Sequence, residues 1–221
     1  MKNSIITVVY SHGRYGSPWY GFKIETLRLI ALKLGVNINS IRYPEELTVE
    51  EMENKLFKAV VDDVNVPGDL VFLSSSRGAY ISTRISQKVK EYFDNESIRM
   101  DDDKVLPRRH LLGQFLIAPA FYIKPEYYPD QNPIPSLDME TTIIQGFDDK
   151  IIDPAKTIEF ATKFKAELHL LKGGHRLNSQ RNMLCNLFEN FLKRLKEQSN
   201  TKFEKWLLSN PQKKVEPDDK K

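Results

Sequence analysis

The sequence contains a single cysteine, no long apolar run and little excess charge, and each shortage argues against a class of protein. Cys185 is the only thiol in 221 residues, so no intrachain disulfide can form. This agrees with a reducing compartment and predicts a cytoplasmic protein. The apolar run 5–10 is too short and too β-branched for a signal peptide, and no run approaches a transmembrane length. We therefore expect neither a leader nor an integral membrane segment.

Charge and metal-ligating residues narrow the choice further. The 33 lysines and arginines are scattered among 30 acidic residues, for a net charge of +3, which argues against nucleic acid as the main partner. The four histidines show no metal-ligand spacing, and the aspartates 101–103 lack the spaced glycine and distal glutamate of a calcium loop. We expect no metal and no cofactor.

What the chain does contain is an alternation of strand and helix patterns. Short β-branched or apolar runs alternate with segments whose apolar residues recur at helical spacing. This order predicts parallel strands with helices on both faces, an α/β fold built as a three-layer αβα sandwich. The sheet is expected to be mostly parallel, doubly wound and about six strands wide. Strands are expected near 5–10, 36–43, 70–73, 111–118, 141–145 and 167–171.

The expected helices follow from capping signals. Ser17 and Pro18 are typical of the N-cap and first residue of a helix, and Gly35 suits its C-terminal cap. Thr48 and Glu51 have the spacing of a capping box. The last helix is expected over 179–196, so we predict one domain over 1–196 and a polar, lysine-rich tail over 197–221.

Ser76 stands where the third strand meets the third helix. A serine on such a sharp bend needs small residues two positions before and after it, because the strained backbone leaves no room for large side chains. Ser74 and Gly78 occupy these positions. The pattern predicts a nucleophile at Ser76, and the alternative is a serine-rich loop that only caps the helix.

Polar or glycine-rich loops follow four of the predicted strands. They carry the segment 12–14, Ser76, Asp149 and His175. Ligands of a parallel sheet bind where such loops gather, at the carboxyl ends of the strands. A serine nucleophile needs a base and a carboxylate that orients the base. The chain supplies all three in the order serine, acid, histidine.

These motifs resemble the α/β-hydrolases, in particular small bacterial members with little or no cap, over about 5–195. His12-Gly13-Arg14-Tyr15-Gly16 matches the family's His-Gly-x-x-Gly loop, Gly146 to Pro154 is similar to its acid loop, and Gly173-Gly174-His175 is similar to its histidine loop. The sequence departs from the family at Ser74, where a glycine is usual, and at Asp153, which separates Ile152 from Pro154.

The resemblance implies a site for acyl transfer. Ser76 would be the nucleophile, His175 the general base and then acid, and Asp149 the carboxylate, with Asp148 as its rival. The backbone N–H groups of Arg14 and Arg77 would form the oxyanion hole. The implied activity is hydrolysis of a small ester or thioester through an acyl-enzyme.

Two questions stay open at this point. Tyr15, Phe121 and Tyr122 could contact the substrate, or such aromatic residues could simply pack their loops against the sheet. The chain could also be a non-catalytic α/β-hydrolase-fold protein that binds a partner or small ligand, an alternative favoured by Ser74 and by Arg77 beside the nucleophile.

Overall fold

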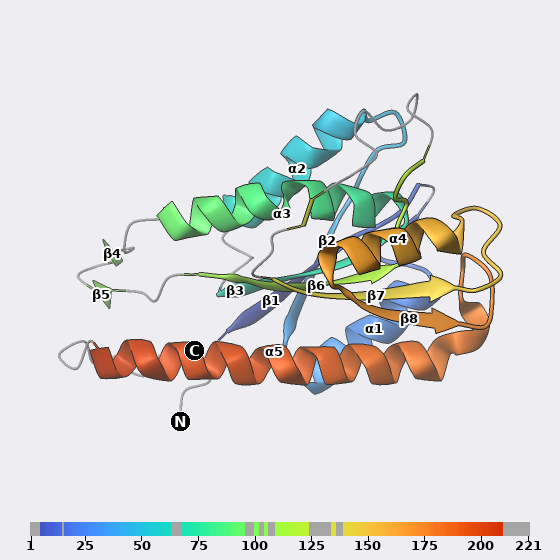
Figure 1. Ribbon diagram of the computed structural model, residues 1–221. Coiled ribbons are helices and arrows are strands. Elements are labelled where there is room, and N and C mark those ends of the chain that lie inside the picture. Colours follow the sequence, from blue (N-terminus) through green and yellow to red (C-terminus); the bar gives the residue numbers. More distant parts are fainter. Residues whose placement is uncertain are drawn as a thin grey trace.

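A computed structural model describes residues 5–14, 16–62, 68–95, 100–101, 104–105, 109–123, 134–135 and 139–209. Its centre is a parallel sheet of six strands, as the alternating pattern predicts (Figure 1). In spatial order the strands are β2 (Asn37–Ile41), β1 (Ile6–Ser11), β3 (Asp69–Ser75), β6 (Leu111–Ile117), β7 (Glu140–Gly146) and β8 (Glu167–Leu171).

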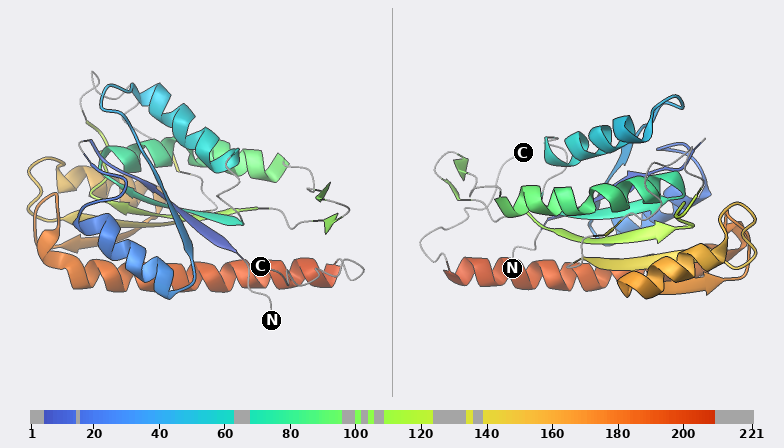
Figure 2. Two further views of the ribbon diagram at one scale, coloured as in Figure 1. Left: turned by 180° about the vertical axis from the view of Figure 1, so that it is seen from behind. Right: turned by 45° about the horizontal axis from the view of Figure 1, so that its top comes forward.

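Helices cover both faces of this sheet, which gives the predicted three layers. One face carries α1 (Phe22–Lys33) and α5 (Arg181–Ser209), and the views of Figures 1 and 2 place them together. The other face carries α2 (Val49–Val61), α3 (Arg77–Asn95) and α4 (Pro154–Phe164). A short 3-10 turn, η1 (Asn178–Gln180), precedes α5, and the small strands β4 (Met100–Asp101) and β5 (Lys104–Val105) pair with each other.

Two apolar clusters, one on each face, hold the layers together. Side chains alternate along β3, so Phe72 packs with the α2, α3 and α4 side, whereas Val71 packs with the α1 and α5 side. On the α1 and α5 side, the ring of Phe115 in β6 packs against two rings of α5. The centroid distances are 5.2 Å to Phe188 and 5.4 Å to Phe191. Burial of both sheet faces explains why these strands have continuous apolar runs.

The helix boundaries differ from the sequence expectation at two places. The first helix begins at Phe22 rather than at Pro18, because Gly21 has a φ of 119°, which is not a helical conformation. Ser17 instead closes an isolated turn, where its hydroxyl accepts hydrogen bonds from the N–H groups of Trp19 (3.1 Å) and Tyr20 (3.0 Å). The capping box at Thr48 and Glu51 is confirmed.

The last helix was expected to end near Lys196, but it continues to Ser209. Ser199 is buried, and its hydroxyl hydrogen-bonds the carboxylate of Asp69 at the start of β3. This contact attaches the helix to the sheet beyond residue 196, inside the segment expected to be a polar tail. The stretch 210–221 lies outside the described residues.

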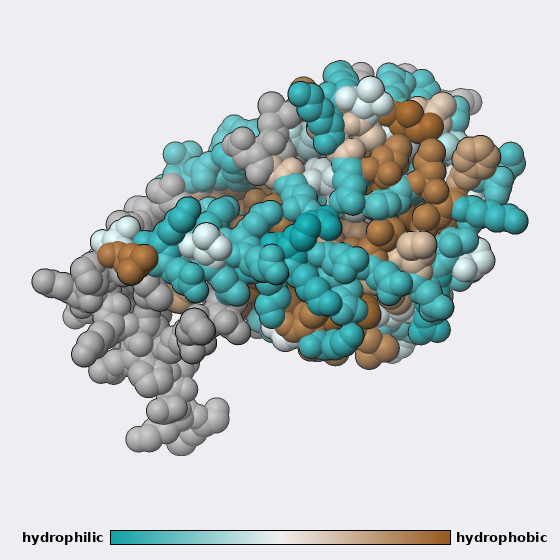
Figure 3. Space-filling view, turned by 60° about the horizontal axis from the view of Figure 1, so that its bottom comes forward, coloured by the Kyte–Doolittle hydropathy of each residue, from teal (hydrophilic) through white to brown (hydrophobic). Residues whose placement is uncertain are grey.

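The face formed by α1 and α5 presents apolar patches between hydrophilic side chains (Figure 3). Its exposed apolar side chains include Leu29, Leu32 and Met183. Across the described ranges, no helix combines the length and the apolarity needed to cross a membrane.

Candidate active site

Ser76 connects β3 to α3 in a strained conformation. Its φ is 52°, a left-handed value that costs a residue other than glycine roughly 1–3 kcal/mol. The surrounding backbone holds it there: the Ser76 N–H donates to the carbonyl of Ile117 (3.0 Å), and its own carbonyl accepts from Ala79 (3.1 Å) and Ala120 (3.1 Å). The serine is thus fixed at the sharp strand-to-helix bend that the sequence predicts.

Glycines let the end of β1 lie against this bend. A Cβ added to Gly78 would lie 2.1 Å from the carbonyl oxygen of Ser11, and one added to Gly13 would lie 2.9 Å from the Cβ of Ser76. Ser74, the departure from the family pattern, is fully buried, and its hydroxyl has no hydrogen-bond partner among the described residues. The bend therefore accommodates a serine at this position without using its hydroxyl.

The structure brings the side chains of Ser76, Asp149 and His175 together at the carboxyl edge of the sheet. Nε2 of His175 lies 3.1 Å from Oγ of Ser76, and Nδ1 lies 2.8 Å from Oδ2 of Asp149. An ionised carboxylate can only accept, so Nδ1 carries the proton and donates it. Nε2 is then the acceptor for the serine hydroxyl, which is the arrangement that a general base requires.

Asp149 is held in its ionised form although its side chain is buried. Burial alone opposes ionisation, but the N–H groups of Ile152 (3.0 Å) and Ile151 (2.8 Å) donate to Oδ1. His175 and the Gln145 amide (3.0 Å) donate to Oδ2. The hydrogen bonds from Ile152, His175 and Ile151 outweigh the effect of burial and lower the pKa of Asp149 below its ordinary value of 3.8.

Its rival, Asp148, lies elsewhere. Asp148 is exposed, and its backbone N–H donates to the carbonyl of Gly173 (2.9 Å). The acid and histidine loops are packed tightly there, since a Cβ on Gly146 would lie 2.5 Å from the same Gly173 oxygen. Of the two acids, Asp149 is the one that contacts the histidine.

Two backbone N–H groups were expected to form an oxyanion hole. Arg77 is the first residue of α3, where N–H groups lack acceptors within the helix and the helix dipole is positive. Arg14 follows Gly13 in the turn after β1. Both donors thus belong to segments that flank Ser76.

His12 anchors the turn after β1. Its Nε2 lies 3.2 Å from the backbone N–H of Tyr43 and must accept from it, so Nδ1 (2.7 Å from the Gly13 carbonyl) is the nitrogen that donates. Burial lowers the pKa of His12, more than the Gly13 hydrogen bond raises it, and the ring is neutral. These two hydrogen bonds give His12 a structural role, because they fix the turn after β1 against the loop that follows β2.

Of the three aromatic residues expected to contact the substrate, the structure describes two, Phe121 and Tyr122. Phe121 is 1% exposed and stacks on Phe160 at 4.0 Å between ring centroids, so it belongs to the core and does not line an open site. Phe121 thus packs its loop against the core, which is the alternative that the sequence left open. Tyr122 is half-buried beside Lys156, and Tyr15 lies outside the described residues.

Sequence reasoning missed Lys23, a half-buried lysine beneath the histidine loop. Its ammonium donates to the backbone carbonyl of His175 (3.4 Å). Burial lowers the pKa of Lys23 to about 8, a shift that the charge of Asp149 opposes and that of Arg176 assists. Lys23 and His175 are 152 residues apart, so only the folded chain pairs them.

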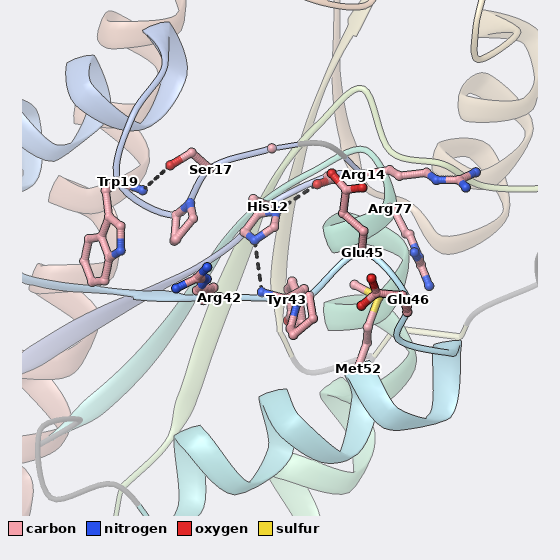
Figure 4. A pocket seen from close by; sticks show the side chains of 14 residues that line it. His12, Arg14, Ser17, Trp19, Arg42, Tyr43, Glu45, Glu46, Met52 and Arg77 are labelled. Atoms are coloured by element: carbon pink, nitrogen blue, oxygen red, sulfur yellow. Dashed lines mark hydrogen bonds between the residues drawn. The ribbon is translucent and has the colours of Figure 1, made fainter.

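A cavity of about 490 Å³ adjoins the bend (Figure 4). It lies between the turn after β1 and the loop from β2 to α2, and the charged residues of that loop were not predicted as part of a site. Its polar and charged lining residues include His12, Arg14, Arg42, Glu45, Glu46 and Arg77. Among the described residues, no cluster of three or more histidine, cysteine or acidic side chains could hold a metal ion.

The architecture matches that of solved α/β-hydrolases. A protein of the α/β hydrolase superfamily from Xanthomonas campestris pv. campestris aligns with a TM-score of 0.66 at 20% identity, over 86% of this chain and 98% of its own. An esterase from Pyrococcus furiosus aligns with a TM-score of 0.63 at 19% identity, over 86% and 83%. Mouse alpha/beta hydrolase domain-containing protein 10 aligns with a TM-score of 0.62 at 13% identity, over 88% of this chain and 92% of its own.

Sequence comparison adds nothing to this likeness, because no family model and no curated protein matches the chain. The topology and the structural neighbours agree on one conclusion. The chain has the α/β-hydrolase fold.

Proposed function

We propose that the protein is a serine hydrolase that cleaves a small carboxylic ester or thioester through an acyl-enzyme. One observation carries the proposal: the imidazole of His175 bridges the hydroxyl of Ser76 (3.1 Å) and the carboxylate of Asp149 (2.8 Å). A serine hydroxyl is a weak nucleophile near neutral pH, and this is the contact that activates it. The fold, shared with an esterase among its structural neighbours, supports the same activity.

In the first step, Oγ of Ser76 attacks the carbonyl carbon while Nε2 of His175 takes the hydroxyl proton. The carboxylate of Asp149 stabilises the imidazolium that forms. The negative charge on the carbonyl oxygen is met by the N–H groups of Arg77 and Arg14, each worth about 10²–10³ in rate for a donor of this kind. The carbon–oxygen or carbon–sulfur bond then breaks, and the leaving group takes the proton from His175.

In the second step, water attacks the acyl-enzyme. His175 accepts a proton from this water and returns it to Oγ of Ser76 as the acyl bond breaks, which releases the acid. Both steps use the same base and the same oxyanion donors, because the two tetrahedral intermediates form at one position.

The test is labelling with a fluorophosphonate, which reacts rapidly only with an activated serine. We expect wild-type protein to be labelled on the peptide that contains Ser76, and Ser76→Ala to lose both the label and at least about 10⁴-fold in ester turnover. Ser74→Ala is the matched control, since it removes a neighbouring hydroxyl that makes no hydrogen bond among the described residues. It should keep the label.

Circular dichroism of each variant separates loss of the nucleophile from loss of the fold. If folded wild-type protein takes no label and cleaves no ester in a panel of increasing acyl length, the proposal is wrong. The binding-protein alternative would then account for the fold.

A further inference from the structure

The cavity beside Ser76 begins at residues that touch the nucleophile. Gly13 and Arg77 line it, and a Cβ on Gly13 would lie 3.4 Å from Oγ of Ser76. A carbonyl group held at Ser76 can therefore place one of its two substituents inside. The volume of about 490 Å³ falls within the range of small-molecule sites.

The position of the histidine decides which substituent this is. A leaving group has to lie within hydrogen-bond reach of Nε2 of His175 to receive its proton. Neither His175 nor Asp149 lines the cavity. The leaving group therefore departs on the histidine side, and the cavity is left for the acyl group.

The floor of the cavity is uncharged. It is formed by His12, Tyr43 and Met52, all buried. His12 is neutral, because its Nε2 accepts the hydrogen bond from the N–H of Tyr43 (3.2 Å) and burial lowers its pKa. Selection by charge must therefore come from the walls.

The two walls carry different charges (Figure 4). Glu45 and Glu46 lie on the same wall as Arg14 and Arg77, so this wall carries charges of both signs, and the Arg77 guanidinium already donates to the carbonyl of Leu47 (2.6 Å). The opposite wall holds Trp19 and Arg42. No carboxylate of the described residues lies within ion-pair distance of Arg42, so its charge is left for a ligand.

We propose, on the basis of the proposed function, that the acyl group of the substrate carries an anionic terminus, a carboxylate, and that Arg42 selects it. The chain of the acyl group would cross the uncharged floor and reach the guanidinium next to Trp19. The wall that holds Glu45 and Glu46 also carries Arg14 and Arg77, whereas Arg42 stands on the opposite wall as its charged residue. Arginine suits this role because its planar fork binds a carboxylate through two hydrogen bonds.

The experiment compares aryl esters of equal acyl length that end in a carboxylate, a methyl group or an ammonium group. Each rate is divided by that ester's rate with hydroxide, which removes differences in intrinsic reactivity. Arg42 is exposed, so we expect a moderate preference, about tenfold in kcat/KM for the carboxylate ester over the methyl ester, expressed mainly in KM. Raising the ionic strength should reduce it.

The variant Arg42→Ala should abolish this preference, so that the ratio of kcat/KM for the carboxylate ester to that for the methyl ester falls from about ten to about one. Lys58→Ala is the matched control, because it removes one positive charge from an exposed position of α2 outside the cavity and should keep the preference. Equal rates with the carboxylate and methyl esters, or a faster ammonium ester, would overturn the inference. So would an Arg42→Ala variant that slows all three esters alike.

Fluorophosphonate labelling separates this failure from failure of the proposed function. A labelled protein that cleaves the methyl ester but ignores acyl charge disproves only the role of Arg42. A folded protein that takes no label and cleaves none of the esters disproves both proposals.

Discussion

The substitution Gly78→Ala tests whether the close approach of β1 to the start of α3 builds the site. The added Cβ would lie 2.1 Å from the carbonyl oxygen of Ser11 and 2.5 Å from that of His12, whereas ordinary contact begins near 3.4 Å. Both neighbours are backbone atoms, so no side chain can rotate away. The two segments must therefore move apart by roughly 1 Å. A backbone shift of this kind is how overpacking destabilises a protein core.

The expected cost is about 3 kcal/mol, the upper end of the usual overpacking range, or roughly 6–12 °C in melting temperature for a domain of this size. The same movement carries the turn with Arg14 away from Ser76. A misplacement of about 1 Å between reacting groups can cost about 100-fold in rate. Gly78→Ala should therefore lose kcat by about this factor even at temperatures where it is fully folded.

Gly35→Ala is the matched control for this prediction. Gly35 has a φ of 65° and no heavy atom within 4 Å of an added Cβ, so the change costs only backbone strain, about 1–2 kcal/mol. It should leave kcat unchanged. Urea unfolding and ester turnover, measured on both variants, check the pair. A Gly78→Ala protein with wild-type stability and turnover would refute the reasoning.

Three further predictions concern charges and a helix cap. Asp149→Asn should lower kcat about 10⁴-fold, because the amide can donate to Nδ1 and favour the wrong tautomer of His175, whereas Asp148→Asn should change turnover little. The pKa of Lys23 is about 8 in the folded state and 10.5 in the unfolded state, because burial opposes the charged ammonium. The charged side chain therefore lowers the free energy of unfolding by its full amount below pH 8, and this loss disappears as the pH rises from 8 to 10.5. Lys23→Met should thus gain up to about 3 kcal/mol at pH 7 and almost none at pH 10.5 in urea unfolding, and an equal gain at both would contradict this. Asp153→Ala should cost about 1 kcal/mol, measured the same way, because Asp153 caps α4 through the N–H of Ala155 (2.9 Å).

Asp149 gives the site a defined pH dependence at its acidic limit. Its folded-state pKa is lowered, so its contribution to stability is complete above its unfolded value near 3.8 and is lost as pH falls through the lower folded value. Its hydrogen bond to His175 is weakened over the same pH range. Asp149→Asn should remove this part of the acid sensitivity in pH-dependent unfolding.

Local patterns in the sequence were sufficient for the architecture and for much of the candidate site. Strand and helix periodicity predicts the parallel sheet because both signals depend on residues only a few positions apart. The bend at Ser76 is predicted for the same reason: Gly78 is needed where two backbones meet, and this requirement is visible in a short motif. The resemblance to the α/β-hydrolases then pointed to His175 and to Asp149 ahead of Asp148.

Contacts between distant segments were decided by the tertiary structure alone. Phe121 is a core residue because α4 brings Phe160 onto its ring, and α5 contacts the sheet past residue 196 because Ser199 donates a hydrogen bond to Asp69. Lys23 meets the histidine loop only through the packing of α1.

The cavity is the clearest example of a feature that the sequence alone could not predict. Its lining comes from the segments that follow β1, β2 and β3, and nothing in the composition of these segments indicates which charges lack a partner. The sequence by itself determined where strands, helices and the strained serine lie, because those features arise from short-range sterics and hydrogen bonding. Which side chains meet, which are buried and which charges stay available for a ligand depends on packing between segments far apart in the chain, and that was decided only by the folded structure.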